Sequence, residues 1–157
     1  MNEIVAGVVI LAVVLGAAGA AGAATDRSVG DLRLSLAVGR TSYHPGETVT
    51  AQLRVTNAGG RPLSLSASSG QQYDLVARQR GAVIWQWSHD KAFVQALRET
   101  TMAPGETLTF SGAWDQRDLQ GRQVEAGAYD ISAVFFGAQR GGPRSIEVGP
   151  VRITIGR

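Results

Sequence analysis

SGQQYDLVARQRGAVIWQWSHDKAFVQAL, residues 69–97, contains two short runs in which apolar side chains occupy every second position. These side chains are Tyr73, Leu75 and Ala77 in the first run and Val83, Trp85 and Trp87 in the second. A period of two is typical of strands with one buried face, because successive side chains of a strand point to opposite sides. Gly81 lies between the runs, where a glycine allows a tight turn. The sequence therefore predicts two strands joined at Arg80-Gly81.

The alternation stops after Trp87. Residues 88–90 read Ser-His-Asp, a combination that begins turns or caps short helices. Phe93 and Leu97 are four residues apart, so both would lie on one side of a helix. We therefore expect a turn or a short helix after the second strand.

The same strand pattern recurs on both sides of this stretch. Further alternating runs cover residues 32–38, 49–56, 63–67, 108–110, 129–135 and 145–155. Turn residues separate them, and Pro150 in the last run indicates a bulge or an edge position. About eight short strands at this spacing predict an all-β fold, an immunoglobulin-like antiparallel β-sandwich.

Tyr129 follows Gly127 at the start of one of these runs. This arrangement resembles the tyrosine corner of immunoglobulin-like sandwiches, whose hydroxyl group bonds back to the preceding loop. We therefore expect a hydrogen bond from Tyr129 to the loop before it.

The N-terminus has a different composition. Residues 4–24 carry no charge, and Ala21-Gly22-Ala23 fits a signal-cleavage pattern, which predicts an apolar helix that is a signal peptide or a membrane anchor over residues 1–24. A cleaved signal is favoured because alanine and glycine dominate the end of the run, although Glu3 stands where a signal peptide has a positive charge. Residues 25–30 are expected to be a linker and residues 31–157 the β-sandwich. This places the domain outside the cell or on the extracytoplasmic face of its membrane.

Composition excludes several classes of site. The chain of 157 residues has no cysteine, so a disulfide, a thiolate zinc site and a cysteine nucleophile are excluded. Its net charge is +2 with both signs interspersed, which does not indicate a nucleic-acid partner. The two histidines, His44 and His89, lie in turns far apart in sequence and in no nucleophile motif. We expect no enzyme activity, no metal and no cofactor.

The loops next to the two central strands carry the candidate binding residues, because function on such scaffolds lies in loops held by a rigid sandwich. These residues are Gln71, Gln72, Ser88, His89, Asp90 and Lys91. Trp85 and Trp87 have two interpretations. They are a platform for a carbohydrate or a peptide, or they pack in the core, and the shared strand face with Val83 favours the core.

The same stretch resembles the BsuPI family, the bacillary intracellular proteinase inhibitor and its relatives. The resemblance covers about residues 48–137 and rests on residues 69–74, Gly81, 83–88, 91–93, 95–97, 104–106, Trp114 and 127–129. It implies an immunoglobulin-like β-sandwich and, for the founding member, inhibition of an intracellular subtilisin-like serine protease. The motif residues with an expected structural role are Tyr73, Asp74, Trp85, Trp87, Phe93, Trp114 and Tyr129. Ala67 departs from the family pattern, which has an aromatic residue there.

Two functions follow as hypotheses. The first is an exported BsuPI-type domain that binds a subtilisin-like serine protease or another envelope protein, and that contacts a membrane only through residues 4–24 if these are not cleaved. The alternative is a non-inhibitory module of the cell envelope that binds a protein or a wall polymer. Inhibition of a purified protease separates them.

Overall fold

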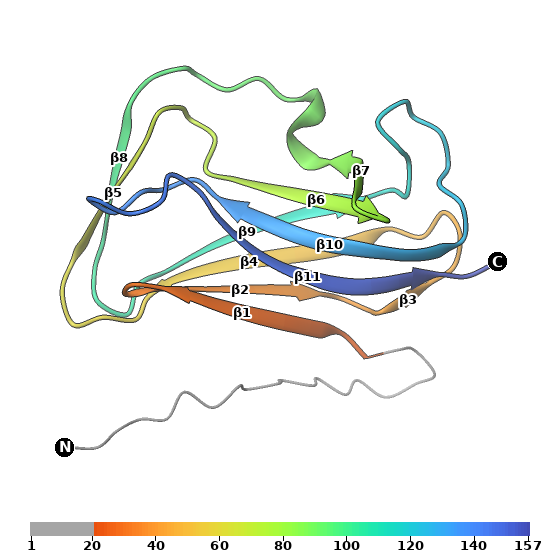
Figure 1. Ribbon diagram of the computed structural model, residues 1–157, viewed down its shortest axis with the longest axis horizontal. Helices are drawn as coiled ribbons and strands as arrows, with labels where there is room; N and C mark the ends of the chain where they lie inside the picture. Colours follow the sequence, from red (N-terminus) through yellow and green to blue (C-terminus); the bar gives the residue numbers. More distant parts are fainter. Residues whose placement is uncertain (1–20) are drawn as a thin grey trace.

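The computed structural model describes residues 21–157, which form a β-sandwich of two large sheets with a small two-stranded sheet at one end (Figure 1). The first sheet has the order β1-β2-β4-β9 and consists of β1 (Ala23–Val29), β2 (Leu32–Val38), β4 (Val49–Asn57) and β9 (Thr107–Trp114). The second has the order β3-β11-β10-β6-β7 and consists of β3 (Ser42–Tyr43), β11 (Ile146–Ile155), β10 (Gly127–Phe135), β6 (Tyr73–Gln79) and β7 (Ala82–Gln86). The small sheet pairs β5 (Leu63–Ala67) with β8 (Arg98–Met102). A short 3-10 helix, η1 (Trp87–Asp90), follows β7.

The all-β sandwich prediction is confirmed. Neighbouring strands run antiparallel, except that the two-residue β3 pairs in parallel with β11. The alternating runs bury one face of each sheet, because every second side chain points between the sheets. Large side chains buried there include Leu34, Leu53, Leu75, Ile131 and Ile153.

Strands β1, β3 and β8 are absent from the sequence prediction. The sequences of β1 and β8 are largely polar, and neither shows the alternation that marks a half-buried strand. Both lie at the edge of a sheet, where pairing with one neighbour is enough. Their pairing therefore depends on the tertiary structure more than on a local pattern.

The predicted linker, residues 25–30, is wrong over most of its length, because residues 25–29 belong to β1. This strand pairs with β2 from Ala23 opposite Val38 to Val29 opposite Leu32. Arg27 Nη1 also donates to the carbonyl oxygen of Glu147 at 2.7 Å, which joins β1 to β11 of the second sheet. The sandwich in the described residues therefore begins before residue 31.

The predicted N-terminal helix falls mostly on residues 1–20, which lie outside the described residues. It does not extend to residue 24, since Ala23 and Ala24 are already part of β1. Among residues 21–157 no helix is both long and apolar enough to cross a membrane.

Two local predictions are confirmed at the C-terminal strands. The buried Tyr129 donates its hydroxyl hydrogen to the carbonyl oxygen of Glu125 at 2.6 Å, which is the predicted tyrosine corner. Burial raises the pKa of this hydroxyl group. The register of β10 against β11 shifts between Ile131 and Ala133, which places a bulge beside Pro150.

Candidate functional site

The two candidate loops meet at one buried carboxylate, that of Asp74 on β6. The Gln71 amide nitrogen Nε2 donates to Asp74 Oδ2 at 3.3 Å. Ser88 donates twice, from Oγ to Oδ2 at 2.6 Å and from its backbone N–H to Oδ1 at 3.1 Å. Asp74 is only 2% exposed. The Asp74 carboxylate therefore holds together two loops whose bonded residues, Gln71 and Ser88, are 17 residues apart in sequence.

Asp74 also binds its own sheet. Gln86 Nε2 donates to Oδ2 at 2.6 Å, and the backbone N–H of Leu75 donates to Oδ1 at 2.9 Å. All five donors to the carboxylate are uncharged groups. A buried carboxylate needs such hydrogen bonds to offset its lost hydration. Asp74 thus connects β6, the end of β7, η1 and the loop before β6.

Aromatic rings pack in a row that includes Trp87, the first residue of η1. The centroid of the Trp87 ring lies 4.3 Å from that of the Tyr73 ring and 6.2 Å from that of the Phe93 ring. Tyr73 also stacks on Phe110 of β9 at 4.8 Å. Gly112 makes room for this packing, because a Cβ atom there would lie 3.0 Å from Trp87 Cδ1. The row joins the second sheet to the edge of the first.

Trp85 and Trp87 are half-buried and pack against the core. Trp85 stacks on Trp114 with ring centroids 5.9 Å apart. Trp114 is the fully buried tryptophan, and its Nε1 donates to the carbonyl oxygen of Arg117 at 2.8 Å. Val83, which shares their strand face, is 42% exposed. Burial therefore decreases along β7 from the end nearest η1 to the hairpin turn.

The turn that contains His89, Asp90 and Lys91 is exposed and borders a pocket of about 470 Å³. The opposite wall of this pocket comes from residues 115–121. Lys91 Nζ lies 3.2 Å from Asp90 Oδ1, and this hydrogen bond lowers the pKa of Asp90. The same ammonium group lies 4.4 Å over the Trp87 ring. Arg117 pairs with Asp115 on the other wall at 3.8 Å, so the charged groups of the pocket neutralise one another locally.

The predicted helix that places Phe93 and Leu97 on one side is wrong, although η1 is a short helical turn. The helix ends at Asp90, and Lys91 has extended φ and ψ angles of −115° and 148°. Residues 91–97, which we call the strap, form neither helix nor strand. The strap leads along the outside of the molecule from η1 to β8 (Figure 1). Four-residue spacing of two apolar side chains is a weak helix signal in so short a segment.

Arg98 holds the far end of the strap, and no sequence pattern predicts this role. Its guanidinium group donates to the carbonyl oxygens of Phe136 at 3.0 Å, Gln71 at 3.4 Å and Ser69 at 3.4 Å. These acceptors are 27 to 38 residues away in sequence. Backbone carbonyls belong to every residue type, so no sequence pattern could have identified them.

Gln116, which is buried, is another polar residue that no sequence pattern singled out. Its Nε2 donates to the carbonyl oxygens of His44 and Glu47, both at 2.8 Å, and its Oε1 accepts from the N–H of Gly46 at 3.0 Å. The backbone N–H of His44 bonds to the Glu47 carboxylate and lowers the pKa of Glu47. His44 therefore sits in a structured turn. In residues 21–157, no three histidine, aspartate or glutamate side chains gather as a possible metal site.

A model of the protein family described as BsuPI, intracellular proteinase inhibitor, matches residues 36–140, about two thirds of the chain. The chain belongs to the BsuPI family. The match includes both candidate loops, Asp74, the strap and Arg98, so the predicted resemblance is confirmed. No curated protein sequence matches the chain.

Membership of the BsuPI family corrects one expectation. The family is described as an intracellular inhibitor, which contradicts our prediction that the domain is secreted or lies on the extracytoplasmic face of the membrane. That prediction rested on the apolar run at residues 4–24. An apolar run shows that a segment is hydrophobic, but it does not by itself predict where the protein is located, since a buried segment can be equally apolar.

Several solved structures are similar to this BsuPI-family chain at low identity. Spo0M, a sporulation control protein from Bacillus subtilis, has 16% identity and a TM-score of 0.45, with 81% of this chain and 50% of that chain covered. The β-glucosidase EmGH1 from Erythrobacter marinus has 19% identity and a TM-score of 0.42, over 85% of this chain and 15% of that chain. The alkylpurine DNA glycosylase AlkC from Pseudomonas fluorescens has 10% identity and a TM-score of 0.45, over 83% and 32%. This chain thus spans half or less of the length of each.

Proposed function

We propose that this chain is a proteinase-inhibitor-like domain that binds a serine protease of the subtilisin type through the loops joined by Asp74. The observation that carries the proposal is the BsuPI family match, which extends over all of these loops. The domain acts by occupying the protease and carries out no catalytic step of its own.

The local geometry supports this role. An inhibitor binds tightly when its contact loops are ordered before binding, because less conformational entropy is then lost. Here Gln71 and Ser88 are fixed on the buried Asp74. Arg98 fixes the same region from the other side through the Gln71 and Phe136 carbonyl groups. The remaining candidate contacts beside them are Gln72, His89, Asp90 and Lys91.

The test is a titration of the purified chain against a panel of serine proteases that includes subtilisin types. We expect residual activity of at least one protease to fall in proportion to added chain, and the chain to remain intact on a denaturing gel. If the chain leaves every protease fully active, or is simply digested, the inhibitor function is wrong. A non-inhibitory module that binds another protein is then the better description.

A further inference from the structure

The strap presents the largest apolar side chains that this face exposes to solvent. Val94 is 73% exposed and Leu97 is 75% exposed. Val83, on the hairpin between β6 and β7, is the third large exposed apolar residue of the described chain, at 42%. Exposing apolar side chains to water is unfavourable by about 25 cal/mol per Å². Two large exposed apolar side chains on one short segment therefore call for an explanation.

The first half of the strap is fastened to η1. The backbone N–H of Lys91 donates to the Ser88 carbonyl oxygen at 3.1 Å, and Lys91 Nζ donates to the Trp87 carbonyl oxygen at 3.0 Å. Phe93 packs on Trp87 and is half-buried. Because Ser88 is itself bound to Asp74, the position of the strap depends on that carboxylate.

The second half is fastened at two points. Gly70 donates its backbone N–H to the Val94 carbonyl oxygen at 2.7 Å, and Arg98 binds three carbonyl groups beyond the strap. Between these points, the backbone groups of Gln95 and Ala96 form no hydrogen bond with any other residue in 21–157. The strap is therefore an exposed backbone held at both ends, with two apolar side chains and a free peptide edge.

We propose that residues 94–97 are the segment that enters the substrate cleft of the protease, with the Leu97 side chain in an apolar specificity pocket and Val94 in a second one. This inference rests on the proposed function and names its contact segment. An extended peptide binds such a cleft by adding a strand, with main-chain hydrogen bonds for affinity and side-chain pockets for specificity. The free backbone groups of Gln95 and Ala96 are available for that pairing.

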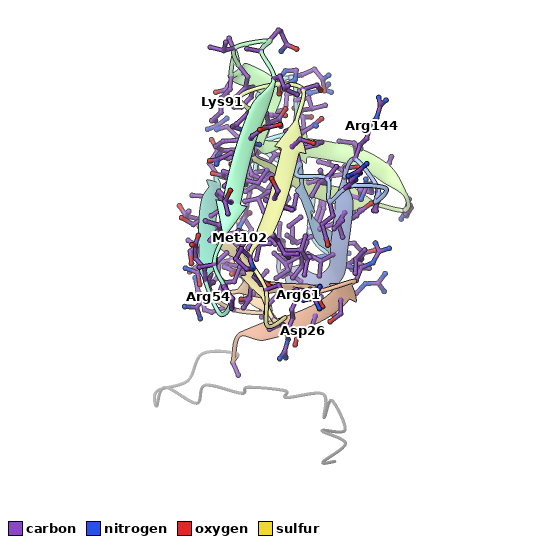
Figure 2. The ribbon with its side chains drawn as sticks, turned by 90° about the vertical axis from the view of Figure 1, so that its left-hand side faces the viewer. Asp26, Arg54, Arg61, Lys91, Met102 and Arg144 are labelled. Atoms are coloured by element: carbon purple, nitrogen blue, oxygen red, sulfur yellow. The ribbon has the colours of Figure 1, made fainter. Side chains whose placement is uncertain are left out.

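The geometry also assigns different roles to the loops around the strap. Gln71 and Ser88 direct their side chains to Asp74 and serve as supports. Lys91 lies at the end of the molecule away from Asp26 on β1, so β1 is remote from this contact region (Figure 2). The partner of the strap is therefore expected to touch η1 and β8 and to leave the β1 edge free.

The experiment uses the full chain and a protease that the wild-type chain inhibits. The variants are Leu97→Asp and Val94→Asp, and the matched control is Val83→Asp, which places the same charge at an exposed valine away from the strap. We expect Leu97→Asp to raise the inhibition constant at least tenfold, as loss of a central apolar contact does, and Val83→Asp to leave it within twofold. Leu97→Met keeps an apolar side chain and should retain inhibition.

Urea unfolding of each variant separates loss of contact from loss of fold, since all three positions are exposed and the midpoints should agree. Unchanged inhibition by both strap variants overturns the assignment while leaving the proposed function standing. An equal loss of inhibition in Val83→Asp also overturns the assignment of the strap, because the loss then comes from the added charge and not from its position on the strap. If the wild-type chain inhibits no protease, the proposed function fails and the assignment of the strap fails with it.

Discussion

At the scale of single residues, Asp74 shows how a buried charge organises a surface. Its carboxylate is too far from solvent to be hydrated, and five uncharged donors replace the lost water contacts. These donors come from four different parts of the chain. One side chain on β6 therefore sets the relative positions of loops that contain the candidate binding residues.

We predict that Asp74→Ala destabilises the domain by about 2–4 kcal/mol, because the half-buried donors of Gln86 and Ser88 lose their acceptor. The free energy of unfolding in urea measures the loss. Asp130→Ala is the matched control, since Asp130 also lies on a strand but pairs with an exposed Arg152. Such a surface pair contributes less than about 1 kcal/mol. Equal losses in the two variants would contradict the role assigned to Asp74.

The tryptophans give a second residue-scale prediction. Trp114 is 1% exposed, so Trp114→Ala should cost about 3–5 kcal/mol through the cavity that it leaves. Trp85 is half-buried and stacks on Trp114, so Trp85→Ala should cost about 2 kcal/mol. Chemical denaturation of both variants gives the comparison. A larger loss of stability for Trp85→Ala than for Trp114→Ala would show that the tryptophan of β7 stabilises the domain more than the buried tryptophan of β9.

At the scale of elements, β1 is the strand whose contribution is least evident from its own residues. None of its seven residues is fully buried, yet it pairs with β2 over its whole length and reaches β11 through Arg27. An edge strand of this kind covers the backbone of its neighbour, which otherwise exposes unpaired N–H and C=O groups.

A chain that begins at residue 31 should therefore be less stable than one that begins at residue 21. We expect the difference to be on the order of 2 kcal/mol, since the backbone hydrogen bonds of β1 are partly offset by the entropy of ordering it. Unfolding midpoints of the two purified chains test this. Identical midpoints would mean that residues 23–29 pair with β2 without stabilising it.

At the scale of the whole molecule, the three tyrosines link stability to alkaline pH. Burial raises the pKa of Tyr43, Tyr73 and Tyr129 above the usual value near 10.0. Each folded hydroxyl group then holds its proton at a pH at which the unfolded chain has lost it. Their contribution to stability is fully present below pH 10.0 and is lost as pH rises from there through the raised folded values.

We therefore predict that the free energy of unfolding is constant near pH 9 and falls with rising pH above about 10. Urea denaturation at a series of alkaline pH values measures the slope. Tyr129→Phe removes one of the three groups and also the hydrogen bond to Glu125, so it should start from a lower stability and fall less steeply. A slope unchanged by this substitution would show that Tyr129 does not contribute to the pH dependence.

Much of the architecture could be read from the residues themselves. The alternation in β2, β4, β6 and β10 predicts strands because a pleated chain places every second side chain on one face. The position of Tyr129 just after Gly127 predicts the tyrosine corner, and its hydrogen-bond partner Glu125 is only four residues away in sequence. The positions of residues 71–72 before β6 and 88–91 after β7 predict the two candidate loops.

The rest depends on contacts between residues that are far apart in sequence. The sequence alone determined which segments form the core strands, because hydrophobic periodicity is a local property. It also determined that the sheets pack face to face, because each such strand has one apolar face that must be buried. Only the tertiary structure decided that β1 and β8 are strands, that Asp74 joins the two loops, and that Arg98 holds the strap. Backbone carbonyl groups and edge strands find their hydrogen-bond partners only when the chain folds. The type of residue therefore does not predict which partner each will have.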